Sequence, residues 1–197
     1  MLRLKNNQSM CSQNFYKRTN CRLCGSEDIK IILKMPSSQP VDGFRRKGDK
    51  YLDLPRFPMD LYLCKSCGHV QLMDIVDPNI LFGNYIYTSS SSPDLHRHFE
   101  LYAKYLKIRV QVKRETNILD VGCNDGLFLG FLNQYSEHLF GLDPAPNITS
   151  SFSNSTITFQ SAYCNKMALK ELVSQKGLKY FDLITANNVF AHADQLN

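Results

Sequence analysis

The chain has 197 residues, 43% of them hydrophobic and 21% charged, which is ordinary for a soluble globular protein of one medium domain or two small ones. No apolar run reaches the roughly 18 residues that cross a bilayer, and residues 1–20 lack the apolar core of a signal peptide. We therefore expect a cytoplasmic protein with no membrane partner.

The net charge of +5 is concentrated near the N-terminus, where residues 1–70 hold 13 Lys and Arg against 6 Asp and Glu. Such a surplus would attract nucleic acid or a nucleotide diphosphate equally well. The stretch lacks the interleaved aromatic and basic residues of an RNA-recognition motif, so we expect no nucleic-acid partner.

Residues 1–20 are polar without a sustained period, and we interpret them as a flexible leader. Two Cys-x-x-Cys-Gly turns follow, at residues 21–25 and 64–68. Each turn can present two thiolates to one tetrahedral zinc ion, with the glycine relieving the backbone. The predicted zinc ligands are Cys21, Cys24, Cys64 and Cys67. Two disulfides are the alternative, which a reducing cytosol disfavours.

Residues 21–75 are predicted to form a small, β-rich zinc ribbon. Short strand-like runs occur at residues 31–33, 51–54, 62–63 and 69–72. A module of this size usually needs its metal to fold, so we expect the zinc to be structural.

Residues 76–112 are predicted to form a loop and a linking helix. The stretch 77–92 is aromatic in the middle and rich in serine at its end; a linker would explain the serines but not Tyr85 and Tyr87. Ser92, followed by Pro93, has the chemistry of a helix start. Apolar residues then recur at positions 95, 99, 102, 106 and 110, which predicts one buried helix face.

The pattern of residues 113–143 predicts a strand, a glycine turn, a helix and a second strand. The first strand, 118–121, leads into a turn with Gly122 and Gly126, and the second ends in Asp143. An acid there can accept hydrogen bonds from two ribose hydroxyls. Asn124 occupies the middle glycine position of the dinucleotide fingerprint, so NAD is disfavoured, although Asn tolerates a left-handed backbone. The alternative is an ordinary turn that binds no nucleotide.

The remaining residues are predicted to complete a four-stranded parallel sheet in an α/β unit covering residues 113–197. A strand at 156–159, a helix at 165–176 ended by Gly177, and a strand at 181–186 follow in turn. Ligands bind at the carboxyl ends of such strands. This edge would collect Gly122, Asp143, Asn187 and Asn188.

Five motifs in this order resemble one family of enzymes. They are the two cysteine turns, Tyr-Ile-Tyr-Thr-Ser-Ser at 85–90, Leu-Asp-Val-Gly-Cys-Asn-Asp-Gly at 119–126, Gly-Leu-Asp-Pro-Ala at 141–145, and Asn-Asn-Val-Phe-Ala-His at 187–192. Over about residues 20–197 they resemble the S-adenosylmethionine (SAM)-dependent C-methyltransferases of nucleotide-linked deoxy-ketosugars, which join a zinc-binding domain to a class I, Rossmann-like methyltransferase domain.

The resemblance implies SAM and structural zinc as cofactors and a nucleotide-linked sugar as substrate. It implies that Asp120 and Gly122 lie near the methionine part of SAM and that Asp143 holds the ribose. The other residues expected in the cofactor site are Asn124, Gly126, Asn187 and Asn188.

In that family the carbon next to the sugar's keto group loses a proton, and the resulting enolate attacks the SAM methyl group. By resemblance, Tyr85 or Tyr87 and His192 face the sugar, with His192 polarising the keto oxygen or assisting proton transfer. The alternative for His192 is a capping or packing role.

The chain differs from the family in the number of predicted strands. The family's sheet has about seven strands and four are predicted here, so we expect a truncated chain that binds SAM weakly and is inactive by itself. Two further readings stay open. One is a class I methyltransferase for another small molecule, and the other is a non-catalytic, zinc-dependent binding module with a degenerate methyltransferase half.

Overall fold

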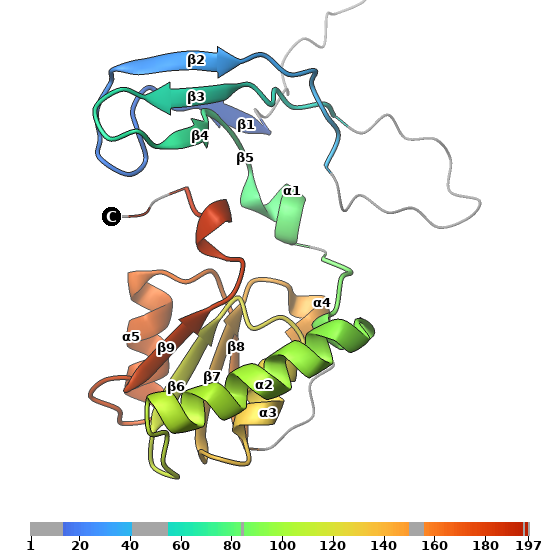
Figure 1. Cartoon of the computed structure of the whole chain (residues 1–197), viewed down its shortest axis with the longest axis vertical. Helices are drawn as coiled ribbons and strands as arrows, with labels where there is room; N and C mark the ends of the chain where they lie inside the picture. The colour runs from blue at the N-terminus through green and yellow to red at the C-terminus, as the bar shows by residue number, and fades with distance from the viewer. Residues whose placement is uncertain (1–13, 41–54, 84, 150–155, 195, 197) are drawn as a thin grey trace, which may run out of the picture. The chain divides into compact units, whose positions relative to one another are not determined.

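A computed structural model of the chain describes residues 14–40, 55–83, 85–149, 156–194 and 196 (Figure 1). The chain forms two compact units, residues 1–80 and residues 81–196. Among the described residues, no helix combines the length and apolar character needed to cross a membrane.

The first unit contains a three-stranded antiparallel sheet with the order β2-β3-β4. Its strands are β2 (Ile29–Leu33), β3 (Leu61–Cys64) and β4 (Val70–Leu72). The β-rich character predicted for this region is confirmed, while the strand expected at 51–54 lies outside the described residues. Both cysteine turns adjoin this sheet, because Cys64 ends β3 and pairs with Ile29 at the start of β2.

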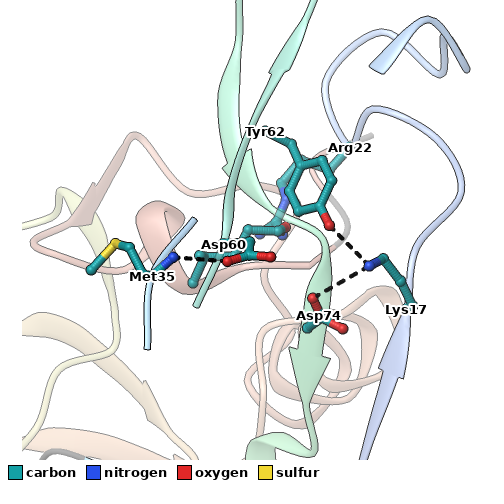
Figure 2. Close-up of polar contacts among 7 residues, drawn as sticks. Lys17, Arg22, Met35, Asp60, Tyr62 and Asp74 are labelled. Atoms are coloured by element: carbon teal, nitrogen blue, oxygen red, sulfur yellow. Dashed lines mark hydrogen bonds and ion pairs between the residues drawn. The ribbon is translucent and has the colours of Figure 1, made fainter. Parts of the chain in front are cut away.

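A second, two-stranded sheet corrects the predicted leader. The strand β1 (Phe15–Lys17) pairs antiparallel with β5 (Asp74–Val76), so these leader residues are ordered. Figure 2 shows Lys17 between Tyr62 and Asp74; its Nζ donates to the Tyr62 hydroxyl at 2.9 Å and lies 3.9 Å from the Asp74 carboxylate. Three residues are too few to show a strand period in the sequence, and the rest of the leader, 1–13, is outside the described residues.

Polar contacts also fasten the first cysteine turn to β4. The backbone N–H of Arg22 donates to Gln71 Oε1 at 3.1 Å, and its guanidinium donates to the Leu72 carbonyl at 2.7 Å. The backbone N–H of Met35 also donates to Asp60 Oδ1 at 2.8 Å (Figure 2). These hydrogen bonds join segments that lie 25 to 50 residues apart in the sequence.

The second unit begins within the short helix α1 (Pro78–Phe82) and continues through the 3-10 turn η1 (Ser89–Ser91) to α2 (Pro93–Arg109). The predicted cap is confirmed, because the Ser92 side chain accepts the N–H of Leu95. Phe99, Ala103 and Leu106 form the buried face of α2. Val110 was predicted on this face but is 45% exposed, because the helix ends at Arg109 and Val110 is its C-cap.

Four parallel strands form the sheet of the second unit in the order β8-β7-β6-β9. They are β6 (Asn117–Val121), β7 (His138–Asp143), β8 (Ile157–Ser161) and β9 (Leu183–Ala186). Between and after them lie α3 (Leu127–Leu132), α4 (Pro146–Thr149), α5 (Lys166–Gln175) and the 3-10 turn η2 (Phe190–His192). The predicted α/β architecture is confirmed, and α4 is a short helix that the sequence analysis did not predict.

Helices cover both faces of this sheet (Figure 1). One core joins α2 and α3 to strand residues such as Ile118 and Leu139. The other joins α5 to Leu119 and Leu142, which are one and three positions further along the same strands and so lie on the opposite face of the sheet. Strands buried on both faces give a rigid base for the loops at their carboxyl ends.

Candidate functional site

The four predicted zinc ligands meet in one cluster in the first unit. The Sγ atoms of Cys21, Cys24, Cys64 and Cys67 all lie within 4.8 Å of one another. Cys21 Sγ is 3.7 Å from Cys67 Sγ, and Cys24 Sγ is 3.6 Å from Cys64 Sγ. Zinc–sulfur bonds of about 2.3 Å in a tetrahedron place sulfur atoms roughly 3.8 Å apart, and a disulfide would place them at about 2.05 Å. The cluster therefore fits a tetrahedral zinc ion.

The two cysteine turns share one backbone geometry. In each, the glycine N–H donates to the carbonyl of the first cysteine at 2.9 Å, from Gly25 to Cys21 and from Gly68 to Cys64. Both glycines have φ +76°, a left-handed conformation that side chains other than Asn and Asp rarely adopt. The glycine that follows each cysteine pair is thus required by the turn that aims the thiolates.

The pKa values of the four cysteine thiols also favour a bound cation. Burial acts to raise the pKa of Cys21, but the backbone N–H groups of Cys24 and Leu23, with the neighbouring thiols, lower it to about 6. For Cys67, the N–H of His69 lowers the pKa, while burial and the other three cysteines raise it to about 12. The thiols therefore compete for negative charge, and a bound divalent cation would let all four ionise.

In the second unit, the predicted cofactor residues lie around one edge of the parallel sheet. Its order β8-β7-β6-β9 places the first strand in the centre, the second and third on one side, and the fourth on the other. The order in which strands are added to the sheet thus reverses between β6 and β9, although all four strands are parallel. In open α/β sheets, ligands bind beyond the carboxyl ends of the strands at such a reversal. Gly122 follows β6, Asp143 ends β7, and Asn187 follows β9.

The glycine turn has the backbone predicted for it. Gly122, Asn124 and Gly126 all have positive φ, at 67°, 50° and 73°. A Cβ on Gly122 would lie 2.4 Å from Val189 Cγ2, so any other residue at this position would force Val189, three residues after β9, to shift. This contact with Val189 could not be anticipated from the turn sequence alone.

Asp143 holds the turn from the next strand. Its Oδ2 accepts the N–H of Asn124 and its Oδ1 accepts the N–H of Ala145, both at 2.9 Å. The side chain is 7% exposed. Burial raises the pKa of Asp143 above its usual value, and the two N–H groups act in the opposite direction. Each carboxylate oxygen keeps a further lone pair, so these bonds leave acceptor capacity for a ribose.

Asp120 is buried within the sheet. Thr185 Oγ1 donates to its Oδ1 at 2.7 Å, from the position directly opposite on β9. Burial raises the pKa of Asp120 to about 7; the Thr185 hydroxyl lowers it and the charge of Asp143 raises it. Thr185 was not anticipated, and the register of two strands 65 residues apart is the only signal that could have found it.

Asn187 and Asn188 differ in their surroundings. Asn187 Nδ2 is buried and has no hydrogen-bond partner among the residues that the structure describes. A buried donor without an acceptor lowers the stability of a fold by about 1–3 kcal/mol, so this nitrogen is a candidate donor to an acceptor group of a ligand. Asn188 is exposed and has a φ of 56°.

The three predicted catalytic residues lie in one aromatic group. The ring of Phe82 is 6.0 Å from that of Tyr85 and 5.9 Å from that of His192, and Tyr85 is 6.4 Å from Tyr87. His192 is exposed at the end of η2, and Tyr87 is 42% exposed. Sequence reasoning did not select Phe82, although it is an aromatic residue within the same stretch as the tyrosines. The catalytic and cofactor roles of all these residues stay predictions.

An open cavity of about 570 Å³ adjoins the glycine turn. Asp125 and Gly126 of the turn line it together with Ser90 and His96. His96 Nε2 lies 3.1 Å from the Ser90 carbonyl oxygen. The glycine turn, the serine-rich segment and the start of α2 therefore all border this cavity.

Comparison with known proteins gives a family match for the first unit. Residues 21–82 match a family model described as a putative zinc binding domain. The C-methyltransferase NovU of Streptomyces niveus is 23% identical over 177 residues, which are 90% of this chain and 42% of that protein. The chain thus spans less than half the length of this curated relative.

Solved structures give weaker likenesses. The plantazolicin methyltransferase BpumL, in complex with a monoazolic desmethylPZN analog and SAH, is 21% identical over 34% of this chain and 27% of that chain, with a TM-score of 0.28. Its complex with a triazolic analog and SAH is 17% identical over 54% of this chain and 46% of that chain, with a TM-score of 0.35.

Proposed function

We propose that the second unit of this chain binds SAM. The premise is that the chain is a distant relative of a C-methyltransferase and that its residues 21–82 match a putative zinc binding domain. The first unit holds one structural zinc ion on Cys21, Cys24, Cys64 and Cys67. With four thiolate ligands the zinc has no open position for a substrate, so it supports the fold and takes no part in chemistry.

The observation that carries the SAM proposal is the juxtaposition of three features at the reversal point of the sheet. They are the left-handed glycine turn after β6, the Asp143 carboxylate at the tip of β7, and Asn187 Nδ2 after β9, which is buried and has no hydrogen-bond partner within the described part of the chain. A nucleoside with two ribose hydroxyls has the donors that Asp143 can accept, and its polar groups can satisfy the Asn187 donor.

We propose further that the substrate is a nucleotide-linked ketosugar and that the product is methylated on carbon. The aromatic group of Phe82, Tyr85, Tyr87 and His192 supports this proposal, because it offers apolar surface for a sugar ring beside an exposed imidazole. His192 would polarise the keto oxygen as the neighbouring carbon loses its proton. The enolate carbon would then attack the methyl group of SAM.

Calorimetric titration with S-adenosylhomocysteine tests the cofactor site. We expect Asp143→Asn to weaken binding roughly 10- to 100-fold, because charged hydrogen bonds to the ribose contribute about 1.5–3 kcal/mol. Asp182→Asn is the matched control, since Asp182 precedes β9 at the opposite edge of the same sheet and accepts the Asn117 N–H there. Equal affinity of wild type and Asp143→Asn would remove Asp143 from the site.

Substrate class is tested by incubating the protein with SAM that carries a labelled methyl group and with a panel of nucleotide-linked ketosugars. Mass spectrometry should find a sugar heavier by one methylene, and His192→Ala should lower the rate by roughly 10²–10⁴-fold. Transfer to another class of small molecule, with none to the sugars, would support the methyltransferase and reject the ketosugar.

A further inference from the structure

The segment Tyr85–Ser91, called here the tyrosine loop, is fastened to the glycine turn by side chains of the turn itself. Asn124 Nδ2 donates to the Tyr87 carbonyl at 2.9 Å, and Asn124 Oδ1 accepts the N–H of Ser89 at 2.8 Å. One amide group thus bonds the loop on both sides of Thr88. These partners are at least 35 residues from Asn124 in the sequence, so the contact is tertiary.

Two further hydrogen bonds extend this attachment. Asp125 Oδ2 accepts the N–H of Ser90 at 2.9 Å, and Asn147 Nδ2 donates to the Tyr85 carbonyl at 2.7 Å. Asn147 lies in α4, just beyond the strand that carries Asp143. The backbone of the tyrosine loop is therefore held at four points, three by the turn that follows β6 and one by α4, which follows β7.

Asn124 connects this loop to the proposed ribose ligand. Its backbone N–H donates to Asp143 Oδ2 at 2.9 Å while its side chain bonds Tyr87 and Ser89. Its φ of 50° lets both interactions form from one residue. Asn124 is thus hydrogen-bonded directly both to Asp143 and to the tyrosine loop.

We propose that Asn124 and Asp125 are positioning residues that hold the tyrosine loop on the cofactor turn, so that ligand binding at Asp143 steadies the loop that faces the substrate. The inference rests on the proposed function and assigns the Asn124 side chain to the loop instead of to SAM. A ligand that orders the turn lowers the entropic cost of ordering the loop for the second ligand, and the effect is reciprocal.

Asn124→Gly tests the attachment directly in the full chain without any ligand. Glycine accepts a φ of 50°, so the substitution removes the side chain without straining the backbone. Amide exchange followed by NMR should be roughly 2- to 10-fold faster at Ser89, the range for one lost hydrogen bond. Gln111→Gly, at a φ of 57° just after α2, is the matched control and should leave Ser89 unchanged.

A conservative variant separates positioning from general loosening. Asn124→Asp keeps an acceptor for the Ser89 N–H and loses the donor to Tyr87, so it should restore slow exchange at Ser89. If Asn124→Gly disturbs the amides of β6, Asp125→Ala with exchange at Ser90 as the readout replaces it. Unchanged exchange at Ser89 in a folded Asn124→Gly, or at Ser90 in Asp125→Ala, would overturn the proposal.

A second arm adds S-adenosylhomocysteine. We expect slower exchange at Ser89 in the wild type and a smaller change in Asn124→Gly. Protection confined to the Gly122–Gly126 turn would overturn the coupling and leave the SAM site standing. No response at the turn or Asp143 would reject the SAM site and the coupling together, while the ligand-free comparison would still decide whether Asn124 holds the loop.

Discussion

The two units of this protein are stabilised in different ways. In the described part of the first unit, the buried apolar side chains are Cys21, Phe57, Cys64 and Met73, and two of these four are metal-ligand candidates. The second unit has two apolar cores, one on each face of its sheet. We therefore expect the first unit to obtain from a metal ion on its four cysteines the stability that the second unit obtains from apolar packing.

This difference also separates the tasks of the two units. A unit held by one tetrahedral metal centre gains its stability from a site whose four coordination positions are all filled by protein ligands, so no position is open for a substrate. A sheet buried on both faces can accommodate a buried acid at Asp120 and, at Asn187 Nδ2, a buried donor that no described residue satisfies. Costs of that kind gather at functional sites.

The largest expected effect that tests this comparison is loss of the metal. Cys64→Ser should unfold the first unit and leave the second folded, because structural zinc contributes about 10–16 kcal/mol in small modules. Metal analysis should find close to one zinc per chain in the wild type, and NMR should show collapse of the β2-β3-β4 amide signals in the variant. Cys164→Ser, at an exposed cysteine outside the cluster, is the control. Retained β3 signals without metal would refute the dependence on zinc.

The next effect concerns the apolar core of the second unit. Leu132 is fully buried at the end of α3, and Leu132→Ala should lower the free energy of unfolding of this unit by about 2–5 kcal/mol. The zinc content should not change. Leu101→Ala, on the exposed face of α2 at 56% exposure, should cost much less. Equal losses from the two substitutions, measured by urea unfolding, would mean that this core is not what stabilises the unit.

A pH effect should distinguish the units further. The pKa of Asp120 is raised to about 7, so between about pH 4 and pH 7 the folded protein keeps a proton that the unfolded chain releases. The free energy of unfolding therefore falls as the pH rises through this range. Asp120→Asn keeps an acceptor for Thr185 and removes this titration, with a gain over wild type of ~1–3 kcal/mol at pH 8.

Urea unfolding at pH 5 and pH 8, followed on amides of the second unit, measures this gain. Glu115→Gln, at an exposed carboxyl, is the control and should show the wild-type slope. A variant with the same pH dependence as wild type would show that Asp120 is ionised in the folded protein.

The smallest effect is expected at a polar contact of the first unit. Lys17→Met removes the hydrogen bond to Tyr62 and the ion pair with Asp74. Lys17 is exposed but the Asp74 side chain is only 6% exposed, so we expect a loss of about 1–2 kcal/mol, above the range for fully exposed pairs. The loss should appear as faster amide exchange in β1 and β5, with zinc still bound. Complete loss of the first unit would mean that this contact, and not the metal, holds it together.

Local chemistry is what the sequence predicted well. The cap at Ser92 and the glycine turns each depend on a few neighbouring residues, and the structure confirms them. The same holds for the four strands of the parallel sheet, since their apolar runs are long enough to identify. The cysteine spacing likewise identified the four members of the cluster before their geometry was known.

Contacts between distant residues could not be predicted in this way. The strand at Phe15–Lys17 exists because Asp74–Val76 pairs with it, and nothing in its own three residues specifies that partner. The contact of Phe82 with His192 forms only where the chain returns 110 residues later. The attachment of the tyrosine loop to Asn124 depends on the same kind of return. These contacts follow from topology and register, which single residues do not encode.

We propose that the second unit binds SAM at the carboxyl edge of its sheet, and that the zinc ion of the first unit only supports the fold. An NMR titration of the zinc-loaded chain with S-adenosylhomocysteine tests this most directly. We predict amide shifts at Gly122–Gly126, Asp143 and Asn187, and none at the four cysteines. Shifts centred on the cysteine turns, or an unperturbed glycine turn at saturating ligand, would contradict it.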